Sequence, residues 1–298
     1  MNPTVLLTSI EQGLIYSLVA LGLYVSFRIL DVADLTTDGS FTLGLVTCTA
    51  FTAAGHPYLG FLAALVAGAL AGGVTAILQT RLGVQPILAG IITMTALISV
   101  NLMILGGKSN LSLLRTETIF TKAKEIFGSN GGLVVAAAAA LLCGGGLVWF
   151  LRTQLGLSLR ATGDNRAMVS ASSINPAFTT TVGLCIANAI VALSGALLSQ
   201  QQGYGDTTLG TGMVVIGLAS LVIGEVITAR RGGVVGAVIA AVLGSVIYRI
   251  ITAFALTSNL GASNLKLVSA VIVAAAISYP TVIAKIKLQQ QKRGHSKC

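Results

Sequence analysis

Apolar segments long enough to cross a membrane follow one another along almost the whole chain of 298 residues. A membrane-spanning helix needs about 20 mostly apolar residues. About nine such helices are predicted, at residues 5–27, 39–55, 58–80, 86–106, 132–151, 177–200, 212–229, 233–256 and 265–284. The second is short and begins in polar sequence, and the seventh is interrupted by glycines, as in the broken helices of transporters. The sequence therefore predicts an all-α, polytopic membrane protein of one domain, with broken helices near a pore.

The composition excludes most soluble classes of protein. Charged residues make up 9% of the chain, against about 25% in soluble domains, so a surface of lipid-facing side chains is expected. The net charge of +9 is attributed to lysines and arginines in cytoplasmic loops. With only 5% aromatic residues, no nucleic-acid partner is expected. The four cysteines include no CxxC pair, so neither a metal site nor a disulfide framework is predicted.

The basic residues predict the orientation of the chain. With nine spans, about twelve of the 18 Lys and Arg residues fall on one side of the membrane, at Arg28, Arg81, the loop 152–176, Arg230 with Arg231, and the tail 285–298. Because cytoplasmic loops carry the excess of Lys and Arg, this side is the cytoplasm. The C-terminus is then cytoplasmic and the N-terminus extracytoplasmic. The first residues lack the basic region of a cleaved signal peptide, so the first span is expected to remain in the cytoplasmic (inner) membrane.

Three carboxylates, Asp31, Asp34 and Asp38, lie between the first two spans. One interpretation is a solvated turn in which Asp38 or Ser40 caps the second helix. The other is a non-helical gate at the inner mouth of a pore. Asparagines inside later spans favour interhelical hydrogen bonds over pore lining. The candidate gate and translocation-path residues are Asp34, Thr36, Thr37, Asp38, Ser40, Phe41, Asn101 and Asn188.

The longest polar stretch on the predicted cytoplasmic side is 155–176, LGLSLRATGDNRAMVSASSINP. Asp164 and Asn165 can cap a short helix, and Pro176 ends it and lets the next span begin. A short exposed amphipathic helix with a basic edge suits a groove in a soluble partner. The alternative is an ordinary connecting loop.

Within this stretch, LRATGDNRAMVSASSIN resembles the cytoplasmic coupling loop of the branched-chain amino acid and ribose-type ABC importer permeases, whose pattern is LRAxGxNxxxAxxxGIN. Ser173 stands where that family has glycine. The segments DLTTDGSFTLG (34–44) and LASLVIGEVITARRGGVVGAVIAAVLGS (218–245) are similar to two further stretches of the family, and DLTTDGSF is closer to its amino-acid branch, including tryptophan or aromatic amino acid importers. The ATPase-coupling residues implied are Leu159, Arg160, Ala161, Thr162, Gly163, Asp164, Asn165, Arg166, Met168 and Ser173.

The resemblance implies an ABC importer permease fold of the type II-like class and a transport subunit that is not an enzyme. The sequence lacks the GxxxxGK[ST] phosphate loop, so ATP and Mg would be bound by a separate cytoplasmic ATP-binding subunit. An extracytoplasmic substrate-binding protein would deliver a small solute, an amino acid, and the permease would pair with a second copy as a homodimer or with a paralogue as a heterodimer. Topology alone is compatible with export as well as import. The alternative function is an ion- or proton-coupled secondary transporter using Asp31, Asp34 and Asp38.

Two outward segments have two interpretations each. Residues 107–131 form either a short helix in the outer membrane interface or a plain surface loop. Residues 199–212 form either a polar loop or a functional segment, which is a gate or a contact for the substrate-binding protein. On the other side, Glu225 is expected in an ion pair with Arg230 or Arg231, with contact to the ATPase as the alternative. The candidate residues of the extracytoplasmic mouth are Gln200, Gln201, Gln202, Tyr204 and Asp206.

Overall fold

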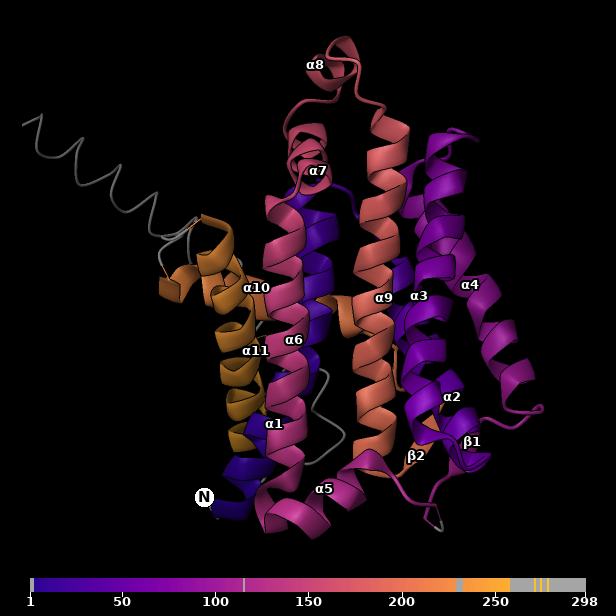
Figure 1. The fold of residues 1–298 in the computed structure, drawn as a ribbon, viewed down its shortest axis with the longest axis vertical. Coiled ribbons are helices and arrows are strands. Elements are labelled where there is room, and N and C mark those ends of the chain that lie inside the picture. Colours follow the sequence, from indigo (N-terminus) through magenta and orange to yellow (C-terminus); the bar gives the residue numbers. More distant parts are fainter. Residues whose placement is uncertain are drawn as a thin grey trace, which may run out of the picture.

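The computed structural model describes residues 3–114, 116–228 and 233–257, together with the isolated positions 271, 274 and 278. Helices form most of this part of the chain (Figure 1). A π-helix, η1, and a short 3-10 helix, η2, extend two of the α-helices, and two short strands form an antiparallel pair. In chain order the elements are α1 (Pro3–Leu23), η1 (Tyr24–Ile29), α2 (Thr36–Ala53), α3 (Pro57–Thr80), α4 (Pro86–Ile104), β1 (Asn110–Ser112), α5 (Ile119–Phe127), η2 (Gly128–Asn130), α6 (Gly131–Arg152), α7 (Gln154–Asp164), α8 (Arg166–Ala171), α9 (Pro176–Gln202), β2 (Tyr204–Asp206), α10 (Met213–Thr228) and α11 (Gly233–Thr257).

Six helices of the described part are long and apolar enough to cross a membrane. They are α1 with η1, α3, α4, α6, α9 and α11, and they match six of the nine predicted segments. The predicted segments 39–55 and 212–229 are present as α2 and α10, but α2 is rich in threonine and α10 has only 16 residues. The ninth segment, 265–284, lies outside the described residues apart from three single positions, and so does the tail 285–298. The structure therefore supports a polytopic helical membrane protein and does not confirm nine spans.

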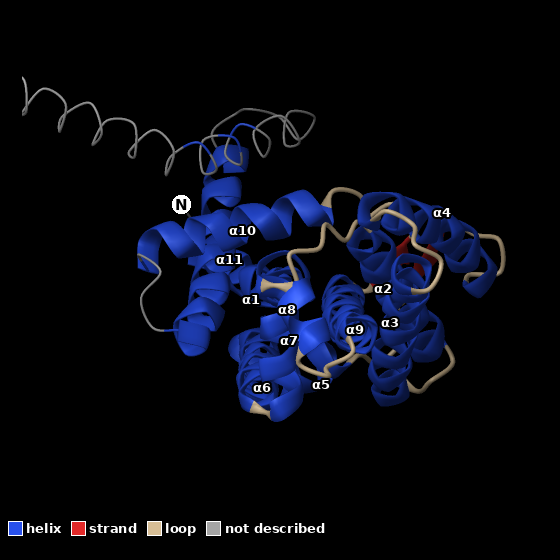
Figure 2. Ribbon diagram, turned by 90° about the horizontal axis from the view of Figure 1, so that it is seen from above, coloured by secondary structure: helices blue, strands red, loops and turns tan. Residues whose placement is uncertain are grey.

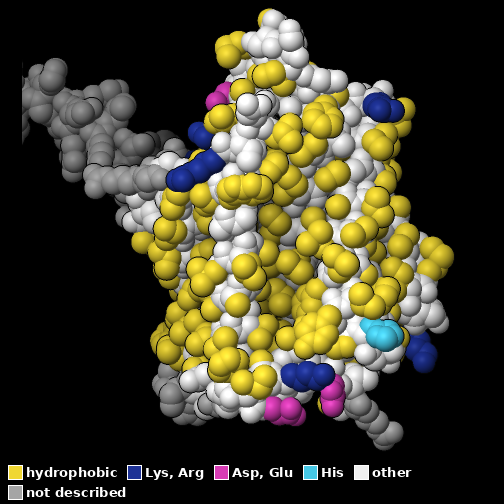
Figure 3. Space-filling model, in the orientation of Figure 1, with side chains coloured by type: hydrophobic (Ala, Val, Ile, Leu, Met, Phe, Trp, Pro, Cys, Tyr) yellow, Lys and Arg dark blue, Asp and Glu magenta, His cyan; other side chains and the backbone are white. Residues whose placement is uncertain are grey.

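The surface of the bundle suits lipid. Hydrophobic side chains cover the middle of the face drawn in Figure 3, while charged side chains gather toward its two ends. Large apolar side chains on the spans point outward, and Leu70, Leu141 and Trp149 are 66%, 76% and 74% exposed. Helices satisfy their own backbone hydrogen bonds, so such a surface is stable in the hydrocarbon core of a membrane.

Helix α9 packs against α1, α2 and α3 and forms the centre of the bundle. Gly195 of α9 lies against the carbonyl of Phe41 in α2, and Gly72 of α3 lies against the carbonyl of Leu184 in α9. At both crossings there is no room for even a methyl group on the glycine. Small residues let helix backbones approach closely in membranes, which explains part of the high glycine content.

The two ends of the bundle are built differently. Helices α7 and α8 project from one end, and α5 with the two strands covers the other end, where the N-terminus also lies (Figure 1). The segment 155–176, in which one short helix was predicted, thus contains most of α7 and all of α8, and it ends at the first residue of α9. The strand pair joins Asn110 to Asp206 and Ser112 to Tyr204, a pairing that an all-α prediction did not include.

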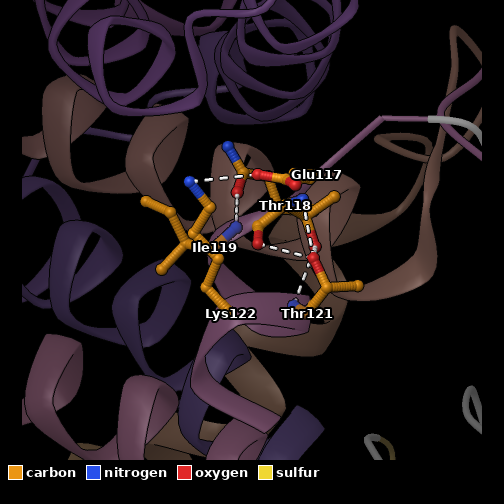
Figure 4. A network of polar contacts seen from close by, with 6 residues as sticks. Glu117, Thr118, Ile119, Thr121 and Lys122 are labelled. Atoms are coloured by element: carbon orange, nitrogen blue, oxygen red, sulfur yellow. Dashed lines mark hydrogen bonds and ion pairs between the residues drawn. The ribbon is translucent and has the colours of Figure 1, made fainter. Parts of the chain in front are cut away.

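Helix α5 is the short helix within the segment 107–131. It begins with a capping box, in which the Thr118 hydroxyl accepts the N–H of Thr121 at 3.1 Å and the Thr121 hydroxyl accepts the N–H of Thr118 at 2.8 Å (Figure 4). These two bonds satisfy backbone donors that the first turn of a helix leaves free. The N–H of Ile119 donates to the Gln200 amide oxygen at 2.9 Å, so α5 is tied to the end of α9.

Candidate functional site

The first candidate site lies where α1 passes through η1 into α2. The chain leaves helical geometry between residues 30 and 35, and α2 begins at Thr36. Asp34 is fully buried in this break. Its carboxylate accepts the N–H of Thr36 at 2.9 Å and the side-chain amide of Asn188, in α9, at 2.7 Å. A buried carboxylate without partners is costly, so these bonds hold the break against the central helix.

A row of threonine hydroxyls continues this contact through three helices. Thr36 of α2 is 2.7 Å from the hydroxyl of Thr75 in α3, which donates to Thr93 of α4 at 2.9 Å. All three side chains are buried. The Thr37 hydroxyl donates to the backbone carbonyl of Asp34 at 3.2 Å. One buried network therefore joins four of the predicted gate residues, which are Asp34, Thr36, Thr37 and Asn188.

Asp38 caps α10. Its two carboxylate oxygens accept the N–H groups of Gly212 and Val214, each at 2.8 Å. The first N–H groups of a helix have no partner within the helix, and a negative charge is favourable at that end. The prediction that Asp38 or Ser40 caps the second helix is therefore wrong. The Ser40 hydroxyl is buried within α2 and has no hydrogen-bond partner among the described residues.

Helix α10 lies across the long axis of the bundle in both ribbon views (Figures 1 and 2). It begins beside the first turn of α2, and its first residues, Met213 and Val214, are buried. It ends near η1, where Glu225 holds Arg28 through contacts of 2.7 and 2.9 Å. Arg230 and Arg231, the partners predicted for Glu225, lie outside the described residues. The seventh predicted span is thus a short, crossing helix whose two ends are fixed by acidic side chains.

The three acids of the first connection have three different environments. Asp31 is exposed and has a φ of 53°, Asp34 is buried in the network with Asn188, and Asp38 binds the start of α10. They do not share one solvated turn or one ion site. The remaining gate candidates lie elsewhere, with Phe41 stacked on Tyr16 of α1. Among the described residues, no group of His, Cys, Asp and Glu is suited to hold a metal ion.

The second candidate site is the lever, a name we use for α7 and α8, residues 154–171. Both helices of the lever have a side chain as N-cap. The Thr153 hydroxyl accepts the N–H of Gly156 at 3.3 Å, and the Asn165 amide oxygen accepts the N–H of Met168 at 3.0 Å. Helix α8 forms the tip of the molecule (Figure 1). Ser173 follows it with a φ of 61°, in the left-handed region that favours the glycine of the family pattern. The exposed coupling candidates are Arg160, Asp164, Asn165, Arg166, Met168 and Ser173.

The inner side of the lever contacts η1 and α9. Leu159 and Thr162 are buried, and Ala161 is half-buried. The Thr162 and Thr179 hydroxyls are 2.8 Å apart, which joins α7 to the start of α9. Gly163 lies so close to the carbonyl of Ile29, in η1, that a methyl group would not fit. The lever therefore contacts η1 directly, and η1 leads into the break that contains Asp34. Short π-helical segments occur frequently at functional sites.

At the opposite end, two glutamines of the predicted mouth form hydrogen bonds to neighbouring helices of the bundle. Gln200 is 1% exposed, and its amide nitrogen donates to the carbonyl of Pro57 at 3.2 Å. The Gln201 amide donates to the carboxylate of Glu11, a buried acid of α1, at 3.0 Å. Gln202 is half-buried. The glutamine run thus fastens the end of α9 to its neighbours.

Asp206 stabilises the strand pair at the same end. Its carboxylate accepts the backbone N–H of Thr208 at 2.7 Å, the Thr208 hydroxyl at 2.6 Å and the side-chain amide of Asn110 at 3.3 Å. Burial of this group acts to raise its pKa, but the hydrogen bonds outweigh burial and lower the pKa of Asp206 below its ordinary value of 3.8. Asp206 is therefore ionised when it closes the turn after β2.

The structure also reveals polar residues of the spans that the sequence analysis did not single out. Glu11 is one, and Arg249 of α11 is another, with its guanidinium carbon 4.3 Å from the centre of the Tyr16 ring. Both were visible as lone charges inside apolar segments, and such charges are usually functional. Asn101, which was singled out, is buried in α4, and its amide oxygen has no partner among the described residues.

Comparison with known proteins finds one matching family and two curated relatives. Residues 5–288 match the family described as the permease component of branched-chain amino acid transport systems. A tyrosine transport system permease protein from Clostridioides difficile (strain R20291) is 33% identical over 288 residues, which are 96% of this chain and 95% of the relative. An uncharacterised protein from Rickettsia prowazekii (strain Madrid E) is 30% identical over 223 residues, which are 75% of this chain and 78% of that protein. No solved structure matches the chain.

Proposed function

The chain belongs to the branched-chain amino acid transport permease family, and on this basis we propose that it imports an amino acid as the membrane subunit of a binding-protein-dependent ABC importer. Its family and its apolar helices make it a multi-pass protein of the inner membrane and a permease of an ABC-type transporter. The relative named as a tyrosine permease is similar along nearly its whole length, which favours an aromatic amino acid such as tyrosine as the cargo. The sequence contains no phosphate loop, so a separate ATPase subunit supplies the energy.

The proposed coupling between the ATPase and the membrane helices depends on the contact between Gly163 of the lever and the Ile29 carbonyl of η1. The ATPase would hold the exposed tip of the lever, at residues such as Arg166 and Met168. When the ATPase subunits close, the lever would push η1 and shift the break that Asp34 anchors to α9. Packed cores switch between discrete arrangements, so a small push at the lever is expected to move α2 as a unit.

We assign one partner protein to each end of the bundle. In the proposed orientation the lever faces the cytoplasm, and the end with α5 and the strand pair meets the substrate-binding protein. A second permease copy or a paralogue would complete the complex, so that each of two ATPase subunits has one lever. This chain would contribute a path and gates, with ATP and Mg bound only by the ATPase.

Purification of the protein from its native membrane tests this proposal. We expect an ATPase subunit to co-purify, and the reconstituted complex to take up labelled L-tyrosine only when ATP and the substrate-binding protein are present. Purification without an ATPase, combined with uptake driven by an ion gradient, would contradict the proposal.

The change Gly163→Ala tests the lever contact. The added methyl group has to displace the Ile29 carbonyl, so we expect the complex to assemble and hydrolyse ATP but to lose coupled uptake. Gly146→Ala is the matched control, because Gly146 lies in α6 with open space around it. Full uptake by Gly163→Ala at normal protein levels would show that η1 does not transmit the motion.

A further inference from the structure

Arg249 is a cation in a membrane span with no acidic partner. All nine Asp and Glu residues of the chain lie in its described part. Two of them form ion pairs there, Glu225 with Arg28 and Glu117 with Lys122, and none pairs with Arg249. The Nε atom of Arg249 is buried without a hydrogen-bond partner among the described residues. Ionisable residues inside membranes usually pair with another group or mark the path of a substrate.

The surroundings of Arg249 come from several elements. Its guanidinium lies over Tyr16 of α1, and the Tyr16 ring is stacked on Phe41 of α2 with 6.1 Å between ring centres. Tyr248, the preceding residue of α11, is 1% exposed, and its hydroxyl has no partner among the described residues. Tyr204 of β2 lies close enough to Tyr16 to interact with it electrostatically. The cluster thus faces the end of the bundle that carries the strand pair.

The contact between α1 and α11 is well defined at this level. One turn before Arg249, the Ser245 hydroxyl donates to the Gly13 carbonyl at 2.8 Å, and Gly13 packs against Val246. Arg249 therefore lies one turn beyond a close contact between α1 and α11. Arg249 lies roughly 12 Å from the end of α11, given a rise of about 1.5 Å per residue, which is too deep for a headgroup contact to be assumed.

The contact with Tyr16 does not account for the charge. A cation–π pair attracts the guanidinium to the ring face but offers no acceptor for its N–H groups. An arginine inside a membrane helix is costly unless its charge is paired or solvated. The guanidinium thus lacks an anionic partner, and both the Arg249 Nε atom and the neighbouring Tyr248 hydroxyl have no hydrogen-bond partner among the described residues.

We propose that Arg249 binds the carboxylate of the amino acid during its passage, with Tyr16 holding the guanidinium in position and Tyr248 offering a further hydrogen-bond donor. This inference rests on the proposed import of an amino acid. Every amino acid carries a carboxylate that must lose water within the membrane, and the planar guanidinium can bind it through two parallel hydrogen bonds. No acid of the described residues competes with the cargo for the guanidinium.

The change Arg249→Met separates this role from a structural one. Removing an unpaired charge from the membrane should leave thermal stability of the purified complex unchanged or raised. ATP hydrolysis stimulated by the loaded substrate-binding protein should remain, while ATP-driven uptake of L-tyrosine into proteoliposomes should fall at least about tenfold, the loss expected for a hydrogen bond between charged groups. Arg249→Lys keeps the charge and should retain more uptake than Arg249→Met. Arg81→Met, in the exposed turn after α3, is the matched control and should behave as the unchanged protein.

Three outcomes would overturn the assignment. Unchanged uptake by Arg249→Met would remove the carboxylate site. A joint loss of thermal stability, ATP hydrolysis and uptake would make Arg249 a structural residue, and an Arg249→Lys complex no better than Arg249→Met would show that its charge is not used. If the unchanged complex took up no amino acid, the proposed function itself would fail, and the Arg249 site would fail with it.

Discussion

The buried Asp34 carboxylate accepts the Thr36 N–H and the Asn188 amide, which also donates to the Leu184 carbonyl at 3.0 Å. Replacing Asp34 with alanine leaves the Thr36 N–H and one N–H of the Asn188 amide without this acceptor beside a void. A buried donor without a partner costs about 1–3 kcal/mol, so we expect Asp34→Ala to lower the thermal stability of the purified protein by that order. Asp31→Asn is the control, because Asp31 is exposed, asparagine tolerates its φ of 53°, and the change should shift stability only slightly. Equal stability of the two variants would show that the Asp34 network does not hold the break.

Asp206 gives the strand pair a dependence on pH. Its pKa is lower in the folded protein than the ordinary 3.8, so its ionised form is favoured by folding. This contribution is complete above about pH 4 and is lost as the pH falls through the folded pKa. The stability difference between the unchanged protein and Asp206→Asn should therefore be constant near neutral pH and vanish in strong acid. A difference that grows as the pH falls would contradict the assigned hydrogen bonds.

The sequence predicted which polar residues of the spans take part in the buried network better than it predicted their hydrogen-bond partners. Asp34 and Asn188 were both singled out, but their bond spans 154 positions, and no local spacing predicts such a pair. Arg249 was overlooked because it was counted within an apolar helix. A search for single charges inside predicted spans would have found it.

Helix α10 depends on an acid from another element. Asp38 supplies its cap, so Asp38→Ala should fray the first turn of α10 at a cost of about 0.5–2 kcal/mol. We expect faster hydrogen exchange at residues 212–216 and reduced uptake, with residues 240–250 of α11 unchanged. Asp38→Asn keeps an acceptor oxygen and should have a smaller effect. Unchanged exchange in Asp38→Ala would mean that α10 is held by its packing alone.

The elements that the sequence predicted well are those whose length and composition decide their structure. Six segments of about 20 apolar residues became six candidate spans. The course of α10 could not be predicted in this way. Its start is capped by Asp38, a residue of α2, and the Arg28–Glu225 pair helps to fix its end. Helix α7 was hidden in a polar segment, since its buried residues, Leu159 and Thr162, face η1 and α9 and not lipid.

The whole molecule has one end with a protruding lever and another closed by α5 and the strand pair (Figure 1). The family implies association with an ATPase and a substrate-binding protein, which agrees with the lack of a GxxxxGK[ST] phosphate loop in the sequence. Sequence analysis could place the lever and the mouth on opposite sides, because the positive-inside rule acts on whole loops. It could not show that the lever reaches the Asp34 break, since that connection runs through the packing of Gly163 on η1.

Labelling of single cysteines can determine which side of the membrane the lever faces. In a variant whose own cysteines are replaced, Met168→Cys places a thiol on the exposed tip of α8, and Ile126→Cys places one on the exposed side of α5 at the opposite end. We expect an impermeant thiol reagent to label Ile126→Cys in intact cells and Met168→Cys only in inverted membrane vesicles. Labelling of Met168→Cys in intact cells would place the lever outside the cell, where a cytoplasmic ATPase could not reach it.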